Sequence, residues 1–387
     1  MGVQVRKRVM VVYGTRPEAI KMAPLVRALD DHPGLDPVVA VTGQHREMLD
    51  QVNDLFDITP QHDLDLMVPG ASLTDVAGRA VMRLGELLAA DAPDAVVVQG
   101  DTSTAFMGAL AAFYCQIPVV HLEAGLRTGD LTAPFPEEAN RVLTTRITSL
   151  HLAPTTVAAE NLAREGVHPD NVTVTGNTVI DALRAAVATP AVFNDRELGR
   201  VVAEGRRLVL VTAHRRESWG EPMREAMCAV RDVAEAHPGL VWIVPMHLNP
   251  TVRAEIEAVL KDLADVHLTE PLDYHQFCHA MNASTLVLTD SGGVQEEGPG
   301  LGKPVLVMRE TTERPEGVAA GVVRLVGTGR DTVRDALTEL LEDQQAYDAM
   351  AHAVSPFGDG YAAPRAAAAI GQLLGVGSRL PEFGPAV

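Results

Sequence analysis

The chain has few cysteines, few aromatic residues and a deficit of basic residues. Its three cysteines, Cys115, Cys228 and Cys278, lie far apart in apolar helical patterns, without CxxC spacing. We therefore expect three buried thiols in a reducing compartment, the cytoplasm, and no disulfide framework. Lys and Arg number 32 against 51 Asp and Glu, which gives a formal net charge of −19. That balance argues against nucleic-acid or anionic-membrane partners, because both require a basic surface.

Long apolar runs are also missing. No segment approaches the roughly 18 consecutive apolar residues that a membrane-spanning helix needs. The basic cluster at residues 6–8 and the following VMVVY imitate a signal peptide, but the apolar run stops at Gly14 and charge follows at once. We therefore predict a first strand here and expect no membrane association.

What the chain does contain is an alternation of short β-branched runs with longer stretches of helical period. Near-continuous apolar strands separated by helices are typical of a parallel sheet covered on both faces. The alternation restarts at RLVLVTAH, so the sequence predicts two Rossmann-like, doubly wound α/β domains. We expect an N-terminal domain at 1–172, a C-terminal domain at 173–359, and a helix at about 360–376 that returns to the first domain. Residues 189–207 should lie on the surface, and the last dozen residues should be frayed.

Two strand-to-helix turns are candidate anion sites. RVMVVYGTRPEAIKMAP leaves a buried strand and opens a helix, with Arg16 and Lys21 near the helix start. TLVLTDSGGVQEEG offers a second turn, built from Ser291, Gly292 and Gly293. Helix N-termini present unpaired N–H groups and the positive end of the dipole, so two such turns predict a diphosphate-bearing substrate. The alternative is that any α/β protein needs glycine and proline at such turns.

Acidic residues and a histidine follow other predicted strands. Asp101 and Glu123 each come directly after a buried apolar strand, and a desolvated carboxylate is a stronger base. Asp101 has the alternative role of an N-cap. Glu137, with its neighbour Glu138, starts a helix, where interaction with the dipole is the simpler explanation. His214 follows VLVTA beside Arg215 and Arg216, a cationic setting that favours contact with phosphate or general-acid catalysis.

Several common motifs fail on inspection. GLGKP resembles the tail of a P-loop, but Glu297 and Pro304 stand where the motif needs glycine and a hydroxyl residue. No strand is followed by GxGxxG with a downstream acid, no metal-ligand spacing occurs, and no GxSxG turn is present. We expect no metal and no cofactor, so that side chains and substrate alone carry the chemistry.

Taken together, the motifs resemble the bacterial non-hydrolysing UDP-N-acetylglucosamine (UDP-GlcNAc) 2-epimerases. The resemblance runs in order from about residue 9 to 375. It rests on GTRPEAIKMAPL, TGQHREMLDQV, GDTSTA, HLEAGLRTGD, PFPEEANR, TGNTVIDAL, HRRES, DSGGVQEE, GKPVLVMRETTERPE and RLVGT. It implies two Rossmann-like domains facing across a cleft in a GT-B-like arrangement, with UDP bound by the C-terminal domain. It also implies a homodimer.

The resemblance further implies a reaction and residue roles. Members of the family interconvert UDP-GlcNAc and UDP-ManNAc by eliminating UDP to 2-acetamidoglucal and adding it back, without a redox cofactor. Asp101, Glu123, Glu137 and His214 match the catalytic positions. Matches to nucleotide-sugar contacts are Arg16, Lys21, Phe277, Ser291, Gly292, Gly293, Glu297 and Arg314.

Two positions match the region where many relatives bind an activating second UDP-GlcNAc. These are Gln44 and His45, but the stretch at 67–72 lacks an arginine that some relatives have. Leu272 likewise stands where some relatives present a glutamine to uracil. Three other functions fit the same fold: a glycosyltransferase, an epimerase acting on a related UDP-sugar, and an idle nucleotide-sugar sensor.

Overall fold

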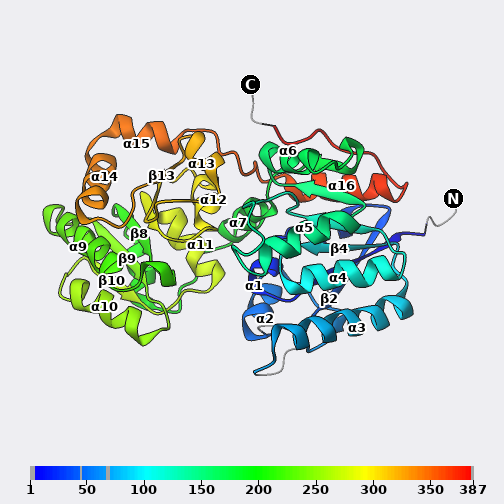
Figure 1. The fold of residues 1–387 in the computed structure, drawn as a ribbon. Coiled ribbons are helices and arrows are strands. Elements are labelled where there is room, and N and C mark those ends of the chain that lie inside the picture. Colours follow the sequence, from blue (N-terminus) through cyan, green and yellow to red (C-terminus); the bar gives the residue numbers. More distant parts are fainter. Residues whose placement is uncertain (1–4, 44–45, 67–69, 385–387) are drawn as a thin grey trace. The chain divides into compact units, whose positions relative to one another are not determined.

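The computed structural model describes residues 5–43, 46–66 and 70–384, which form two compact units (Figure 1). Unit 1 contains the chain up to Ala182 and again from Phe357, and unit 2 contains Leu183–Pro356. Each unit is built on one parallel sheet with helices on its faces, which confirms the predicted doubly wound α/β class. No helix in the described part of the chain is both long enough and apolar enough to cross a membrane.

The sheet of unit 1 has the strand order β3-β2-β1-β4-β5-β6-β7. Its order reverses between β1 and β4, the place where ligands bind in open α/β sheets. The strand interiors are apolar and buried, as in VMVVY of β1. The strands are β1 (Lys7–Tyr13), β2 (Leu35–Val41), β3 (His62–Asp63), β4 (Ala95–Gln99), β5 (Val119–Leu122), β6 (Leu150–Ala153) and β7 (Val172–Val174).

The helices of unit 1 come from both ends of the chain. Helix α16, red in Figure 1, packs against α1 although almost the whole sequence separates them. The helices are α1 (Arg16–Asp31), α2 (Arg46–Leu55), α3 (Leu73–Asp91), α4 (Ser103–Tyr114), α5 (Glu137–Ile147), α6 (Thr156–Arg164), the 3-10 turn η1 (Pro169–Asn171), the first turns of α7 (Thr178–Ala188) and α16 (Ala362–Leu373).

Unit 2 has a six-stranded sheet in the order β10-β9-β8-β11-β12-β13, which reverses between β8 and β11. Its strands are β8 (Leu208–Thr212), β9 (Val241–Pro245), β10 (Val266–Thr269), β11 (Leu286–Thr289), β12 (Val305–Val307) and β13 (Val323–Leu325). Its other elements are α8 (Arg196–Ala203), η2 (Arg216–Ser218), α9 (Glu221–Ala236), α10 (Pro250–Leu260), α11 (Tyr274–Ala283), α12 (Val294–Gly300), α13 (Pro315–Ala319), α14 (Arg330–Glu342) and α15 (Gln344–Ala351).

The structure places the unit boundary after β7 rather than at residue 172. The short strand β7 pairs with β6 as the edge of the first sheet, so the chain leaves unit 1 only within α7. Residues 189–207 are mostly exposed, as predicted, and part of this segment forms α8, whose Leu198 and Val201 are buried.

Two smaller expectations are wrong. The chain's last described residues are not frayed, because Phe383 is buried and its N–H donates to the carbonyl of Val174 at 2.8 Å. Of the three thiols only Cys278 is buried, and Cys115 and Cys228 are half-buried. Cys115 directly follows the last residue of α4, near the end of the helix, where the core covers it on one side only.

Candidate active site

Glu123 is the centre of a polar cluster at the carboxyl end of the unit 1 sheet. It directly follows β5, is only 9 % exposed, and has a φ of 63° in the left-handed region. Its Oε1 accepts hydrogen bonds from Lys21 and, at 2.9 Å, from Nδ2 of Asn177, and its Oε2 accepts one from Gln99. The charge of Lys21 compensates a carboxylate that would otherwise be costly to bury. Three elements, α1, β4 and the segment after β7, therefore fix this side chain.

Asp101 lies in the neighbouring turn, directly after Gly100. A Cβ on Gly100 would come within 3.4 Å of Glu123 Oε2, so the two acidic residues share one end of the sheet. Asp101 Oδ2 pairs with Arg141 of α5, and its carbonyl accepts a 2.8 Å hydrogen bond from Asn140. The N-cap of α4 is Thr102, whose Oγ1 accepts from the N–H of Ala105, so Asp101 is not the cap.

Arg141 also connects Asp101 to Glu138. Glu138 is 1 % exposed, pairs with Arg141 at 3.1 Å and accepts the N–H groups of Thr128 and Gly129, both at 3.0 Å. Glu137, the first residue of α5, is half-buried and makes no hydrogen bond or ion pair with any described residue. It lies one turn before Asn140 on the same helix face, near Asp101. Of the two adjacent glutamates, Glu138 is therefore structural and Glu137 is available.

The turn after β1 differs from the predicted anion site. Its N–H groups at Gly14 and Thr15 donate to the carboxylate of Glu18, at 3.1 and 2.8 Å, and Thr102 also donates to Glu18. Glu18 is 1 % exposed, and its burial raises its pKa. The chain's own acid thus satisfies the donors that were expected to bind a ligand, and Lys21 contacts Glu123 instead. Arg16 remains half-buried at the helix start, without a partner among the described residues.

His214 and Asp290 form the corresponding centre in unit 2. They follow the neighbouring strands β8 and β11, which pair in parallel. Nδ1 of His214 lies 2.8 Å from Oδ1 of Asp290, and Asp290 is buried while His214 is half-exposed. The charged group that contacts the ring is therefore a carboxylate, in addition to the arginines at 215 and 216 from which the sequence predicted a cationic setting.

Two guanidinium groups lie beside the turn at Ser291–Gly293, and each also pairs with a carboxylate, Arg314 with Glu296 and Arg215 with Glu313. A Cβ on Gly292 would lie 2.8 Å from an Arg314 guanidinium nitrogen and 3.4 Å from one of Arg215, so glycine alone lets both approach the backbone. The N–H of Ser291 donates to Thr289 at 2.9 Å, whereas those of Gly292 and Gly293 bond to no acceptor in the described chain. The structure thus provides two backbone donors and two guanidinium groups at one point, which suits an anion.

Glu297 lies beside this turn. Its Oε2 is 3.8 Å from the Cβ position of Gly293, and its charge helps to raise the pKa values of Tyr274 and Cys278, although burial is the larger cause for both. Phe277 lies on the same helix as these two residues, α11, and is half-buried. The structure therefore groups Glu297, Arg314 and the Ser291–Gly293 turn, with Phe277 on the adjoining helix.

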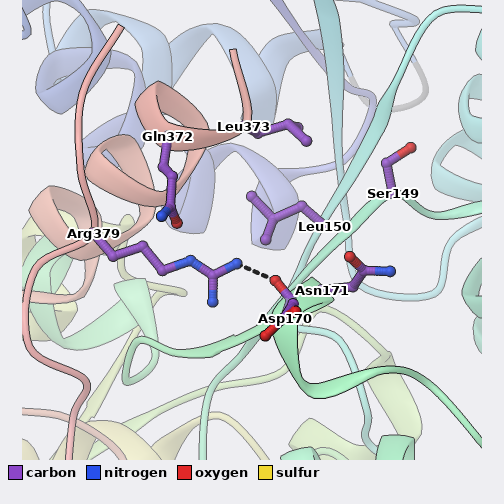
Figure 2. Close-up of a pocket in the computed structure, with 7 residues that line it drawn as sticks. All are labelled: Ser149, Leu150, Asp170, Asn171, Gln372, Leu373 and Arg379. Atoms are coloured by element: carbon purple, nitrogen blue, oxygen red, sulfur yellow. Dashed lines mark hydrogen bonds between the residues drawn. The ribbon is translucent and has the colours of Figure 1, made fainter. Parts of the chain in front are cut away.

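A pocket of about 430 Å³ lies away from all these residues (Figure 2). It is lined by Ser149 and Asn171, which precede β6 and β7, so it lies at the amino end of the unit 1 sheet. Figure 2 shows Arg379 reaching the carbonyl of Asp170, a bond that helps to hold the end of the chain. The predicted regulatory residues Gln44 and His45 lie outside the described residues. Within the described ranges, no group of three or more metal-ligating side chains is present.

The sequence analysis did not identify the residues that form hydrogen bonds or ion pairs with the predicted catalytic residues. Asp290 carried a readable signal, because it follows a buried strand directly, as Asp101 and Glu123 do. Arg141, Gln99 and Asn177 carried none, since an arginine on a helix and amides near strand ends are common. Only the fold shows that they contact the carboxylates.

This architecture is that of the GT-B-like nucleotide-sugar enzymes, two parallel-sheet α/β units with polar turns at the strand ends. The glycosyltransferase of kitacinnamycin shares the fold, with a TM-score of 0.64 at 15% identity over 95% of this chain and 99% of that one. Residues 27–371 match the family model of UDP-N-acetylglucosamine 2-epimerase. The chain belongs to the UDP-N-acetylglucosamine 2-epimerase family, as the sequence motifs predicted.

Individual relatives are similar over nearly their whole lengths. The chain is 49% identical to the UDP-N-acetylglucosamine 2-epimerase of Escherichia coli K12 over 364 residues, 92% of this chain and 96% of that one. A crystal structure from Listeria monocytogenes matches with a TM-score of 0.92 at 45% identity, covering 98% of this chain and 100% of that one. UDP-GlcNAc 2-epimerase from Neisseria meningitidis, bound to UDP-GlcNAc, matches with a TM-score of 0.83 at 43% identity, over 95% and 99% of the chains.

Proposed function

We propose that this protein is a non-hydrolysing isomerase that interconverts UDP-GlcNAc and UDP-ManNAc. In the forward direction a carboxylate takes the proton from C2 of the sugar, the C2–H electron pair forms a C1=C2 double bond, and the C1–O electron pair leaves with UDP. The resulting 2-acetamidoglucal then receives a proton on the opposite face of C2, and UDP rejoins C1. No electrons are gained or lost, so the reaction needs no redox cofactor.

The carboxylates of unit 1 support the proton-transfer steps. The observation that carries the proposal is Glu123, a buried carboxylate held by Lys21, Gln99 and Asn177 beside the turn that bears Asp101. Inversion at C2 requires proton transfer on two faces, hence at least two groups. Asp101, Glu123 and Glu137 supply three carboxylates at one sheet end, and we assign all three to catalysis.

The residues of unit 2 support binding and departure of UDP. Arg314, Arg215 and the N–H groups of Gly292 and Gly293 converge on one point, where they stabilise a diphosphate as its charge grows. His214 contributes a further donor. Glu297 suits the ribose hydroxyls as a bidentate acceptor, and Phe277 packs near uracil. We also assign Arg16 and Lys21 of unit 1 to binding of the nucleotide sugar. The UDP-GlcNAc bound by the Neisseria relative supports this substrate.

An isotope experiment tests reaction type and substrate together. Purified protein is incubated with UDP-GlcNAc in deuterated water and followed by proton NMR. We expect UDP-ManNAc to form, with deuterium at C2 of both sugars. A substrate with ¹⁸O in the bridging C1–O position should scramble this label into non-bridging positions of the β-phosphate, because the bond breaks reversibly.

The same experiment separates the alternatives. Asp101→Asn and His214→Ala should lose exchange of the C2 hydrogen, whereas Asp262→Asn, an exposed position paired with Arg231, should keep it. Sugar transfer to an acceptor without deuterium at C2 would identify a glycosyltransferase. Exchange with a related UDP-sugar but not with UDP-GlcNAc would correct the substrate. If the protein shows neither exchange at C2 nor sugar transfer, it is a nucleotide-sugar sensor without catalytic activity.

We further propose that the enzyme is a cytoplasmic homodimer that pairs through α3 and α4. Met82 of α3 and Phe113 and Tyr114 of α4 are 66, 52 and 70 % exposed. The two helices pack together, and Cys115 at the end of α4 lies 3.9 Å from the carbonyl of Gly85 in α3, one turn after Met82. Large apolar side chains gathered in this way are typical of a surface that another copy covers.

A further inference from the structure

The geometry points to Asp290 as the residue that sets the orientation and tautomer of His214, so that Nε2 of the ring is presented to the departing diphosphate. This inference rests on the proposed function for its catalytic consequence. The structural part of the inference, namely which nitrogen of the His214 ring carries the proton, depends on residues of unit 2 alone. Asp290 acts through His214 and is a positioning residue.

Hydrogen bonds from the backbone fix the carboxylate of Asp290 independently of the His214 ring. It is 1 % exposed, and its Oδ2 accepts the backbone N–H groups of His214 at 2.7 Å and Arg215 at 2.8 Å. These two bonds fix the carboxylate and the backbone that carries the imidazole with respect to each other. The carboxylate therefore has no freedom to turn away from the ring.

The second oxygen is directed at the imidazole. Oδ1 lies 2.8 Å from Nδ1 of His214, at ion-pair distance, and this buried oxygen accepts no other hydrogen bond from the described chain. Burial alone would raise the pKa of Asp290, but the His214 ring and the two N–H groups lower it below its usual value. An ionised carboxylate can only accept, so Nδ1 must carry a proton. Nε2 donates to the diphosphate when the ring is an imidazolium, the form that an adjacent carboxylate stabilises.

The fold brings this pair to the anion site. Thr212 and Thr289 are register partners in β8 and β11, and the chain reaches His214 and Asp290 just beyond them. Ser291, Gly292 and Gly293 follow Asp290 directly, so one turn carries both the positioning carboxylate and the backbone donors. The 45 % exposure of the His214 side chain leaves its far edge open to a ligand.

Asp290→Asn is the sharpest substitution. Asparagine keeps the size and an oxygen for the two backbone N–H groups, but its NH₂ group faces Nδ1 and donates to it. The ring can then no longer donate from Nδ1, so the imidazolium loses the carboxylate that stabilises it, and the ring is left neutral with its proton on Nε2. We expect kcat to fall by at least about 100-fold, while KM and the Kd of UDP change by less than about 3-fold.

Ser284→Ala is the matched control. Ser284 is buried between α11 and the start of β11, where its Oγ donates to the carbonyl of Met281 at 2.7 Å. The Ser284→Ala variant loses a buried hydrogen bond of unit 2, but its side chain does not contact His214. We expect this variant to keep kcat within about 2-fold.

Nitrogen NMR reads the tautomer directly. In ¹⁵N-histidine-labelled protein, the His214 signals are identified as those missing from His214→Gln. The wild type should show the Nδ1–H form or the imidazolium, and Asp290→Asn should show the Nε2–H form. A wild-type ring with Nε2–H alone would overturn the inference even if the variant failed to fold, and so would an Asp290→Asn enzyme with unchanged kcat.

The two failures are distinguishable. If His214 shows the expected tautomers but UDP-GlcNAc gives no C2 exchange, the proposed function falls and the positioning role stands. If exchange occurs and the tautomer does not respond to Asp290, the positioning role falls alone.

Discussion

Two buried glutamates at the same sheet end have different partners, and these partners separate a structural acid from a chemical one. Glu18 accepts from Gly14, Thr15 and Thr102, which are backbone groups and hydroxyls of the two neighbouring turns. Glu123 is held by the side chains of Lys21, Gln99 and Asn177 from three separate elements. The first arrangement is that of a helix cap, and the second is that of a positioned reactive group.

Replacing Glu123 by glutamine should remove activity without removing the fold. Glutamine keeps the shape and one acceptor for Asn177, but it cannot take a proton. We expect kcat for UDP-GlcNAc epimerisation to fall by about 10²–10⁴-fold, the contribution of one general base. Glu165→Gln, which loses a carboxylate that pairs with Arg127 in unit 1, is the control and should keep its rate. Near-normal turnover of Glu123→Gln would remove Glu123 from the mechanism.

His121 and His151 are register partners on β5 and β6 and are buried inside unit 1. Burial, together with the charge of Arg127, lowers the pKa of His121 to about 4, although the carbonyl of Gly100 opposes this by accepting a 2.7 Å hydrogen bond. Burial, His121 and Arg127 lower the pKa of His151 to about 3. Both rings are therefore neutral in the folded protein at pH values where the unfolded chain is protonated.

Acid should therefore destabilise unit 1 through these two histidines. Below about pH 6.5 the unfolded histidines bind protons that the folded ones do not, so the free energy of unfolding falls as pH drops from 6.5 towards 4. The slope is up to about 1.4 kcal/mol per pH unit for each histidine. Urea unfolding of His151→Gln between pH 7 and 5 should show a clearly smaller pH slope. His352→Gln, at an exposed position, should keep the wild-type slope.

At the scale of elements, the turn between β1 and α1 depends on close contact with its neighbours. A Cβ on Gly14 would lie 2.1 Å from Oγ1 of Thr42 and 2.9 Å from Oγ1 of Thr104, two side chains that are themselves hydrogen-bonded at 3.1 Å. The glycine is thus required by lack of space rather than by an unusual φ.

Gly14→Ala should lower the stability of unit 1 by about 1–3 kcal/mol, the usual effect of overpacking. Adding Thr42→Ala removes the closest atom, so the double variant should recover part of the loss. Denaturant unfolding of the two single variants and the double variant gives the coupling energy. Strictly additive losses would show that the contact with Thr42 is not the cause.

The same scale shows which elements the sequence could predict. Strands such as VMVVY and AVVVQ were recognisable because four or more apolar residues run together between turn residues. The strands β3, β7 and β13 have two or three residues each and were missed, as was α8. Short edge strands exist because a neighbour pairs with them, and that pairing leaves no periodic pattern. The error in the domain boundary follows directly from missing β7.

At the scale of the whole molecule, the net charge of −19 opposes association, so a dimer must be driven by apolar contact. Met82→Glu combined with Tyr114→Glu places two acids on the exposed faces of α3 and α4. We expect light scattering to give the mass of two chains for the wild type and of one chain for this variant. Val192→Glu, at a 64 % exposed position of unit 2, should stay dimeric. A monomeric wild type would contradict the proposed interface.

The sequence by itself determined the two doubly wound sheets, and it placed Asp101, Glu123, His214 and the Ser291–Gly293 turn at strand ends. These features are local, because an apolar run and the residue that follows it lie within a few positions of each other in the sequence. The tertiary structure decided what each group contacts. Lys21 reaches Glu123 across 102 residues, and His214 meets Asp290 across 76. Such partners depend on strand order and register, which arise only when the whole sheet forms.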